Sequence, residues 1–86
     1  MRVAFHRGFR KQFQRLNDKD RRRFAQRLKL FLTDPFNPQM RNHALAGEYA
    51  DCRSINAGGD LRAIYTTIEN GRVIFIAIGT HSQLYG

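Results

Sequence analysis

The stretch LRAIYTTIENGRVIFIAI, residues 61–78, decides the fold. Branched, aromatic and other apolar residues predominate on both sides of Asn70-Gly71, which predicts strands from about Leu61 to Ile68 and from about Val73 to Ile78. Asn-Gly is among the strongest signals for a β-hairpin, because both central residues of a type I′ turn need a positive φ. We therefore expect these two strands to be antiparallel neighbours in one sheet.

Two further strands are expected outside the hairpin. From Gly47 onward the pattern is extended and predicts a strand from about Tyr49 to Ile55, followed by a turn at Gly58-Gly59. Met1 to Phe5 alternates weakly between polar and apolar residues and is interpreted as a short N-terminal strand.

Between the N-terminal strand and the strand that begins near Tyr49, apolar residues recur at the spacing of a helix. A first helix is indicated by the apolar residues Phe9, Phe13 and Leu16. A second helix is expected to begin at Asn17 or Asp18 as N-cap and to end at Asp34-Pro35. Its predicted apolar stripe consists of Phe24, Leu28, Phe31 and Leu32. The segment from Asp34 to Asn42, which carries both prolines, is expected to be an irregular connection.

These elements define an α+β fold in the order β-α-α-β-β-β, with two helices packed on one face of a single sheet. The chain has 86 residues, and no internal repeat or linker divides it. A chain this short buries roughly 60–65% of its unfolded surface in one core. Residues 1–86 are therefore expected to form one domain, with seven Phe and three Tyr to fill it.

The positive charge is concentrated in the first half of the chain. Fifteen Lys and Arg against seven Asp and Glu give a net charge of +8, and twelve of the fifteen basic residues are Arg. Residues 1–41 hold twelve basic and three acidic residues, whereas residues 42–86 hold three and four. Clustered arginine of this kind indicates a polyanion or an acidic protein as partner. A solvated helical face is the simpler alternative.

Several classes of function are excluded or disfavoured. The longest apolar run, Val73 to Ile78, is far shorter than the ~20 residues of a membrane span, so we expect a cytosolic protein without membrane contact. A single Cys52 gives no internal disulfide. No phosphate-binding loop or nucleophile elbow is present. The three histidines lack metal-ligand spacing, and we therefore expect no metal and no cofactor.

What remains is a set of polar residues at strand ends and in the adjoining connections: His43, Arg53, Asp60, Arg62, His81 and Tyr85. Cleavage of RNA without a metal needs a base for the 2′-hydroxyl, cations for the scissile phosphate and an acid for the departing 5′-oxygen. Histidine, aspartate and arginine can supply these parts. Each residue also has a structural alternative: Arg62, for example, could pair with Asp60 or Glu69.

Four segments of the chain form a recognisable set: His43-Ala44-Leu45-Ala46-Gly47-Glu48, Asp51-Cys52-Arg53-Ser54-Ile55, Gly59-Asp60-Leu61-Arg62-Ala63-Ile64-Tyr65 and Ile78-Gly79-Thr80-His81-Ser82-Gln83-Leu84-Tyr85. In this order and spacing they resemble the RelE/ParE superfamily of bacterial toxins, and most closely its YafQ-like branch. The resemblance covers nearly the whole chain, and its specific part is the C-terminal half.

The resemblance implies the toxin of a type II toxin–antitoxin pair, an endoribonuclease that cuts mRNA on the translating ribosome. It also implies that His43, Asp60, His81 and Tyr85 lie at catalytic positions. We expect His81 and either Asp60 or His43 to divide the acid and base roles, and Tyr85 to stack on a base. Arg53 and Arg62 would stabilise the charge on the phosphorane.

The basic helices are expected to dock on ribosomal RNA or on the antitoxin through a set of arginines, Arg21, Arg22, Arg23 and Arg27. The antitoxin segment that binds there would be acidic or amphipathic.

One residue departs from the family pattern. Where YafQ-like toxins often carry a second histidine, this chain has Asn56, which cannot exchange a proton near neutral pH. Three other functions stay open: a ParE-like inhibitor of gyrase without nuclease activity, an RNA-binding module in which Asn56 marks a weakened catalytic activity, and a nuclease that acts on free RNA.

Overall fold

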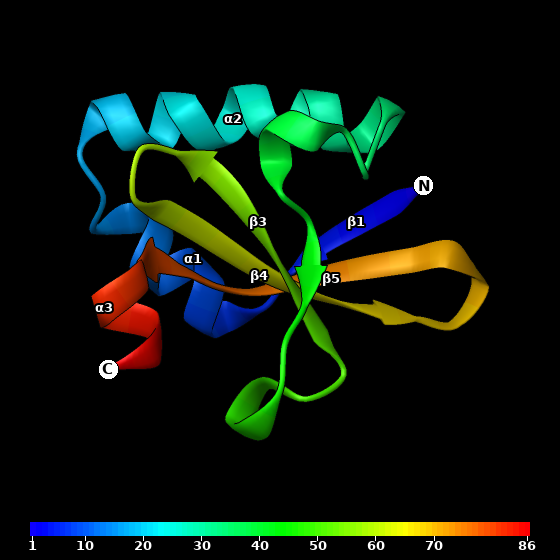
Figure 1. Ribbon diagram of the computed structural model, residues 1–86. Coiled ribbons are helices and arrows are strands. Elements are labelled where there is room, and N and C mark those ends of the chain that lie inside the picture. Colours follow the sequence, from blue (N-terminus) through cyan, green and yellow to red (C-terminus); the bar gives the residue numbers. More distant parts are fainter.

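The computed structural model describes residues 1–86, and its backbone forms one five-stranded sheet with the two N-terminal helices on one face (Figure 1). The strand order is β1-β5-β4-β3-β2. Their bounds are β1 Arg2–Phe5, β2 His43–Ala44, β3 Cys52–Gly58, β4 Leu61–Ile68 and β5 Arg72–Thr80. Strand β1 runs parallel to β5, and all other neighbours are antiparallel. The predicted α+β fold, with two N-terminal helices on a mostly antiparallel sheet, is confirmed.

The hairpin of β4 and β5 forms where Asn70-Gly71 predicted it. Asn70 has a φ of 64° and Gly71 a φ of 70°, so both have the left-handed conformation that the turn needs. The Arg72 N–H donates to the Glu69 carbonyl and closes the turn. Strand β5 is longer than expected, because extended backbone continues through the buried Gly79 to Thr80.

A short strand and a short helix were not predicted, and one predicted strand begins later. Residues Gly47–Tyr49 form a 3-10 turn, and Asp51 has a φ of 71°, so the backbone becomes regular only at Cys52 instead of Tyr49. The two-residue strand β2 pairs with β3 and lies just after the segment 34–42, where no element was expected. The last residues form a short helix, α3 His81–Tyr85, although residues that favour extended structure precede it.

Helices α1 Arg7–Gln14 and α2 Asp18–Thr33 have the predicted positions, and their ends follow from side-chain caps. Asn17 is the N-cap of α2: its Oδ1 accepts a hydrogen bond of 2.8 Å from the Asp20 N–H. His6 caps α1 in the same way through Nδ1, which accepts from the Gly8 N–H at 3.0 Å. This bond gives His6 a structural role.

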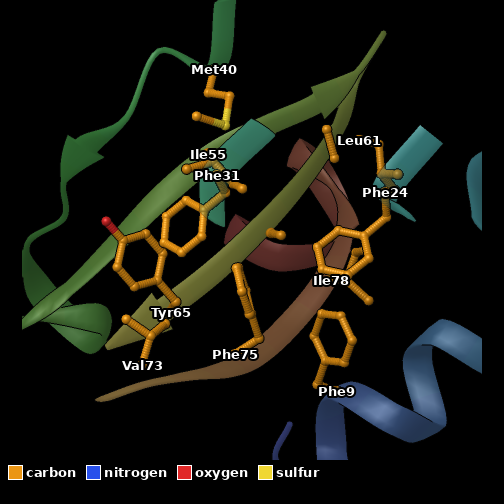
Figure 2. Close-up of a cluster of buried hydrophobic side chains, with 12 residues drawn as sticks. Phe9, Phe24, Phe31, Met40, Ile55, Leu61, Tyr65, Val73, Phe75 and Ile78 are labelled. Atoms are coloured by element: carbon orange, nitrogen blue, oxygen red, sulfur yellow. The ribbon is translucent and has the colours of Figure 1, made fainter. Parts of the chain in front are cut away.

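The core lies between these two helices and the sheet. Helix α1 packs on β5 and α2 on β3. Figure 2 shows Phe9, Phe24 and Phe31 pointing from the helices toward Tyr65 and Phe75 on the strands. Their rings meet in edge-on and tilted contacts with centroids 4.9–5.8 Å apart. Leu32, which the sequence placed in the apolar stripe, is instead 43% exposed, since it follows the buried Phe31 around the helix.

The opposite face of the sheet carries a smaller apolar cluster made of Ile64, Ala77 and Leu84. Leu84 comes from α3, and Leu45 and Tyr49 from the segment between β2 and β3 pack against the cluster. Successive residues of a strand point to opposite faces. Because Ala63 and Tyr65 face the helices, their neighbours Arg62 and Ile64 face this second side. No helix has the length and apolarity of a membrane span.

Candidate active site

A hollow of about 260 Å³ lies on the face of the sheet that the two long helices leave uncovered. It is lined by residues from β2, β3, β4, α3 and the segment after β2, namely His43, Leu45, Ser54, Arg62, His81 and Tyr85. Four of the candidate residues of the sequence analysis, His43, Arg62, His81 and Tyr85, are thus brought together from segments far apart in the chain.

His43 is held by a hydrogen bond that determines its tautomer. Its Nδ1 lies 2.8 Å from the backbone carbonyl oxygen of Arg41. A carbonyl oxygen can only accept, so Nδ1 carries the hydrogen and donates it. In the neutral ring Nε2 is then the nitrogen with the free lone pair. The exposed His43 therefore presents a proton acceptor at Nε2.

His81 and Tyr85 come from one turn of α3, which begins at a complete capping box. The Thr80 hydroxyl accepts from the Gln83 N–H at 3.2 Å, and Gln83 Oε1 accepts from the Thr80 N–H at 2.8 Å. This geometry places the rings of His81 and Tyr85 with centroids 4.8 Å apart. Tyr85 also meets Tyr49 edge-on, at 6.0 Å.

Tyr49 supports Tyr85 from the 3-10 turn beside the hollow. Burial, then the charge of Glu48, and then its neighbours Tyr85 and Cys52 raise the pKa of the Tyr49 hydroxyl above its ordinary value. Tyr49 is therefore a neutral phenol at physiological pH, and its ring packs against that of Tyr85.

Arg62 is oriented by backbone oxygens and not by a carboxylate. Its Nη1 donates to the carbonyls of Gly59 and Leu61, at 3.0 and 3.1 Å. Neither Asp60 nor Glu69 forms an ion pair with it. The guanidinium keeps its charge unpaired and has N–H groups left for an anion in the hollow.

Ser54 is a site residue that the sequence analysis missed. It is fully buried on β3, and its hydroxyl has no hydrogen-bond partner. Buried hydroxyls without a partner are rare because they lose their hydration without compensation. Nothing in the local sequence distinguishes this serine from any other strand residue. Only its pairing with His43 across the sheet and the hollow above it make it a candidate.

Three other residues of the sequence analysis lie outside the hollow. Asp60 is exposed in the turn between β3 and β4. Arg53 faces the helices, where its guanidinium lies 5.2 Å over the Phe36 ring and its Nε donates to Asn42. Asn56 lies opposite Arg62, and its Oδ1 accepts from the Gly58 N–H at 2.7 Å, so this side chain shapes the turn.

The four helix arginines differ in their surroundings. Arg21 pairs with Asp18 and donates to the carbonyls of Gln14 and Leu16, which ties α1 to α2. Arg23 pairs with Asp20 at 3.2 Å, its stem lies on Gly58, and its guanidinium lies near Gly59.

Arg27 donates to Gln39 at 3.1 Å. Arg22 is exposed and makes no such contact. Of the four, only Arg22 has its whole guanidinium available. No cluster of three or more His, Cys, Asp or Glu side chains is present.

The arrangement of this sheet and its two helices is that of the RelE-like toxins. YafQ from Escherichia coli strain BL21(DE3) is similar over 100% of both chains, with a TM-score of 0.74 and 21% identity. The E. coli DinJ–YafQ complex matches over 100% of both chains with a TM-score of 0.72 and 22% identity. The archaeal RelE–RelB complex from Pyrococcus horikoshii OT3 matches over 95% of this chain and 96% of the other, with a TM-score of 0.74 and 21% identity.

The family is shown by sequence. The model of the family described as "Bacterial toxin of type II toxin-antitoxin system, YafQ" matches residues 1–86. The chain therefore belongs to the YafQ family of type II toxin–antitoxin toxins, and the resemblance seen in its motifs is confirmed. No curated protein matches the sequence.

Proposed function

We propose that this toxin is an endoribonuclease that cleaves mRNA on the ribosome, without a metal, by attack of the 2′-hydroxyl on the adjacent phosphate. The observation that carries the proposal is the shared hollow: two imidazoles and one unpaired guanidinium line the same small space on the open face of the sheet. These are the groups that such a reaction needs.

His43 is the general base of the proposed reaction. Its Nδ1–H is donated to the Arg41 carbonyl, which leaves Nε2 free to take the 2′-hydroxyl proton. The 2′-oxygen then forms a bond to phosphorus. Asp60, the alternative base of the sequence analysis, lies in the exposed turn outside the hollow. The geometry therefore favours His43 for this step.

His81 is the general acid. In its protonated form it donates to the 5′-oxygen as the bond from phosphorus to that oxygen breaks. The products are a 2′,3′-cyclic phosphate and a 5′-hydroxyl, and the proton that His43 gains equals the one that His81 gives up. The nearby Tyr85 ring supports the orientation of His81 and offers a face for a nucleobase.

Arg62 and Ser54 stabilise the charged intermediate. The pentacoordinate phosphorane carries an additional negative charge that a guanidinium compensates with two N–H groups at once. The buried hydroxyl of Ser54 on the floor of the hollow is a donor without a partner in the free protein. Because this hydroxyl is fully buried in the free protein, a phosphate or ribose oxygen reaches it only when substrate binding displaces the side chains above it, and it then supplies the missing partner.

The basic helices supply affinity for the ribosome. Phosphate contacts are independent of sequence and weaken as salt rises. Arg22 is the member of the predicted set that is exposed without a contact, so we propose it for docking on ribosomal RNA. Arg21, Arg23 and Arg27 contribute their charge to the same field while they hold the structure together.

The partner that silences the toxin is a cognate antitoxin. An apolar hollow of about 380 Å³ lies between α1 and α2, lined mostly by side chains of the core such as Phe5, Phe13 and Leu28. One exposed cation, Arg10, is part of its lining. An acidic amphipathic segment would match both the apolar floor and the positive charge of Arg10 at its edge. The relatives YafQ and RelE were solved in complexes with DinJ and RelB.

The test is cleavage of a defined mRNA by the purified chain, with and without programmed ribosomes, compared with His81→Gln. We expect cleavage only with ribosomes, ends that carry a 2′,3′-cyclic phosphate, and a loss on the order of 10² or more in the variant. Cleavage without ribosomes would make the chain a nuclease of free RNA. Intact mRNA together with inhibited gyrase would favour the ParE-like function, and intact mRNA with ribosome binding would favour a non-catalytic RNA-binding module.

A further inference from the structure

Arg53 and Asn42 form a hydrogen-bonded pair on the side of the sheet that faces the helices. Arg53 Nε donates to Asn42 Oδ1 at 2.7 Å, and Nη2 donates to the Asn42 backbone carbonyl at 3.4 Å. The guanidinium lies over the Phe36 ring, 5.2 Å from its centre. Arg53 thus donates hydrogen bonds to both the side chain and the backbone of Asn42.

Asn42 is also fixed from its other end. Its Nδ2 donates to the Tyr65 hydroxyl at 2.7 Å and to the Pro35 carbonyl at 2.9 Å. Tyr65 is a core residue, only 3% exposed. All hydrogen-bonding groups of the Asn42 amide are therefore engaged, and they connect the 34–42 segment to the core.

This anchor lies directly beside the backbone that holds His43. Arg41 has a φ of 47°, a left-handed conformation that is unfavourable for a residue with a side chain. Such a conformation persists only where the surroundings hold it. In this conformation the Arg41 carbonyl accepts the Nδ1–H of His43. Asn42 is the one residue between the two, so its anchoring fixes both.

We propose that Arg53 is a positioning residue, which acts through Asn42 to hold the Arg41 carbonyl against Nδ1 of His43 and so keeps Nε2 as the free nitrogen. The catalytic importance of that tautomer rests on the proposed function, whereas its presence in the free protein does not. It assigns Arg53 a different role from phosphate binding, because its side chain lies on the opposite face of the sheet from the hollow.

The test compares Arg53→Met with the native chain and with Arg72→Met. Methionine keeps much of the apolar stem but removes both donors to Asn42. Arg72 is exposed and makes no side-chain hydrogen bond or ion pair, so its replacement removes an equal charge without touching Asn42. The first readout is the tautomer of neutral His43, measured by the nitrogen chemical shifts of its ring in the free protein.

We expect the native chain and Arg72→Met to show the Nδ1–H tautomer, and Arg53→Met to show a mixture in which Nε2–H is populated. In single-turnover cleavage on ribosomes, Arg53→Met should lower the rate roughly 10-fold or more without weakening ribosome binding. Arg53→Lys, which keeps a cation over Phe36 and one donor, should recover part of both effects. If Arg53→Met does not fold, this lysine variant provides the comparison.

Three results would overturn the inference. The first is an Nδ1–H tautomer that persists unchanged in Arg53→Met, and the second is the absence of this tautomer from the native chain. The third is an Arg53→Met variant that binds RNA more weakly but turns over at the native rate, since that result makes Arg53 a substrate ligand. Because the tautomer is measured without substrate, a chain that cleaves no RNA would contradict the proposed function and leave this inference intact.

Discussion

Ser54 lies directly opposite His43 in the antiparallel pairing of β2 and β3, and its fully buried hydroxyl has no hydrogen-bond partner. Side chains opposite each other on one face of such a pair have Cβ atoms about 4.5–5.5 Å apart. The free hydroxyl therefore lies beneath the histidine proposed as base. An unpaired buried hydroxyl costs about 1–3 kcal/mol, which is a reason to expect that the bound substrate pairs with it.

Replacing Ser54 by Ala separates stability from function. We expect the free energy of unfolding in urea to stay the same or to rise, because the substitution removes a group that lacks a partner in the free protein. Single-turnover cleavage should fall roughly 10-fold, since one neutral donor to the substrate is lost. Unchanged cleavage together with increased stability would show that the hydroxyl has no part in the reaction.

Arg62 is predicted to be needed for turnover more than for folding. Its only partners are the carbonyls of Gly59 and Leu61, which lie at the edge of the turn and can bind water instead. Arg62→Gln should lower the cleavage rate on the order of 10² to 10³, as expected for a donor to a developing negative charge. Arg62→Lys should recover part of it, because lysine restores the charge but not the fork. Equal rates for Arg62→Gln and the native chain would remove Arg62 from the site.

Most of the fold could be predicted from the sequence, because its signals are local. Asn70-Gly71 fixed the hairpin, and Asn17 and Asp34-Pro35 marked the ends of α2 through capping and proline sterics. The elements that escaped prediction depend on tertiary contacts. Strand β2 has only two residues and exists because β3 lies beside it, and α3 is one turn stabilised by its capping box and by Leu84 in the apolar cluster.

The candidate site could be predicted only in part, for a related reason. Residue type indicates what chemistry a side chain can do, but the face of the sheet on which it lies depends on register and on bulges. Arg53 and Arg62 looked equivalent in the sequence, each in a strand beside an apolar residue. Their strands place them on opposite faces, so only Arg62 lines the hollow.

Cys52 should react slowly with alkylating reagents. Burial, with a smaller contribution from the charge of Asp51, raises the pKa of its thiol above the ordinary value. At a given pH near neutrality the thiolate, which is the reactive form, is then rarer than in an unfolded chain. The rate of modification by iodoacetamide should be lower in the native protein than in urea, and should rise as the pH increases. A native rate equal to that of the unfolded chain would contradict the expected shift.

The helix arginines are predicted to divide into a docking residue and structural residues. Arg22 is exposed and makes no hydrogen bond or ion pair, whereas the stem of Arg23 contacts Gly58 and its guanidinium pairs with Asp20. Arg22→Ala should leave the free energy of unfolding unchanged and weaken ribosome binding. It should also reduce the slope of log K against log salt concentration by about 1 if it removes one phosphate contact.

Arg23→Ala is the matched comparison, because it removes the same charge from the adjacent position of α2. We expect it to lower the free energy of unfolding by about 1 kcal/mol, mainly through the packing that its stem loses on the turn between β3 and β4. Both quantities can be measured by urea unfolding and by binding to ribosomes over a series of salt concentrations. If the two variants changed the free energy of unfolding equally, the contacts that only Arg23 makes would not contribute to stability, and its proposed structural role would be wrong. If Arg22→Ala bound ribosomes like the native chain at every salt concentration, the docking surface would lie elsewhere on the molecule.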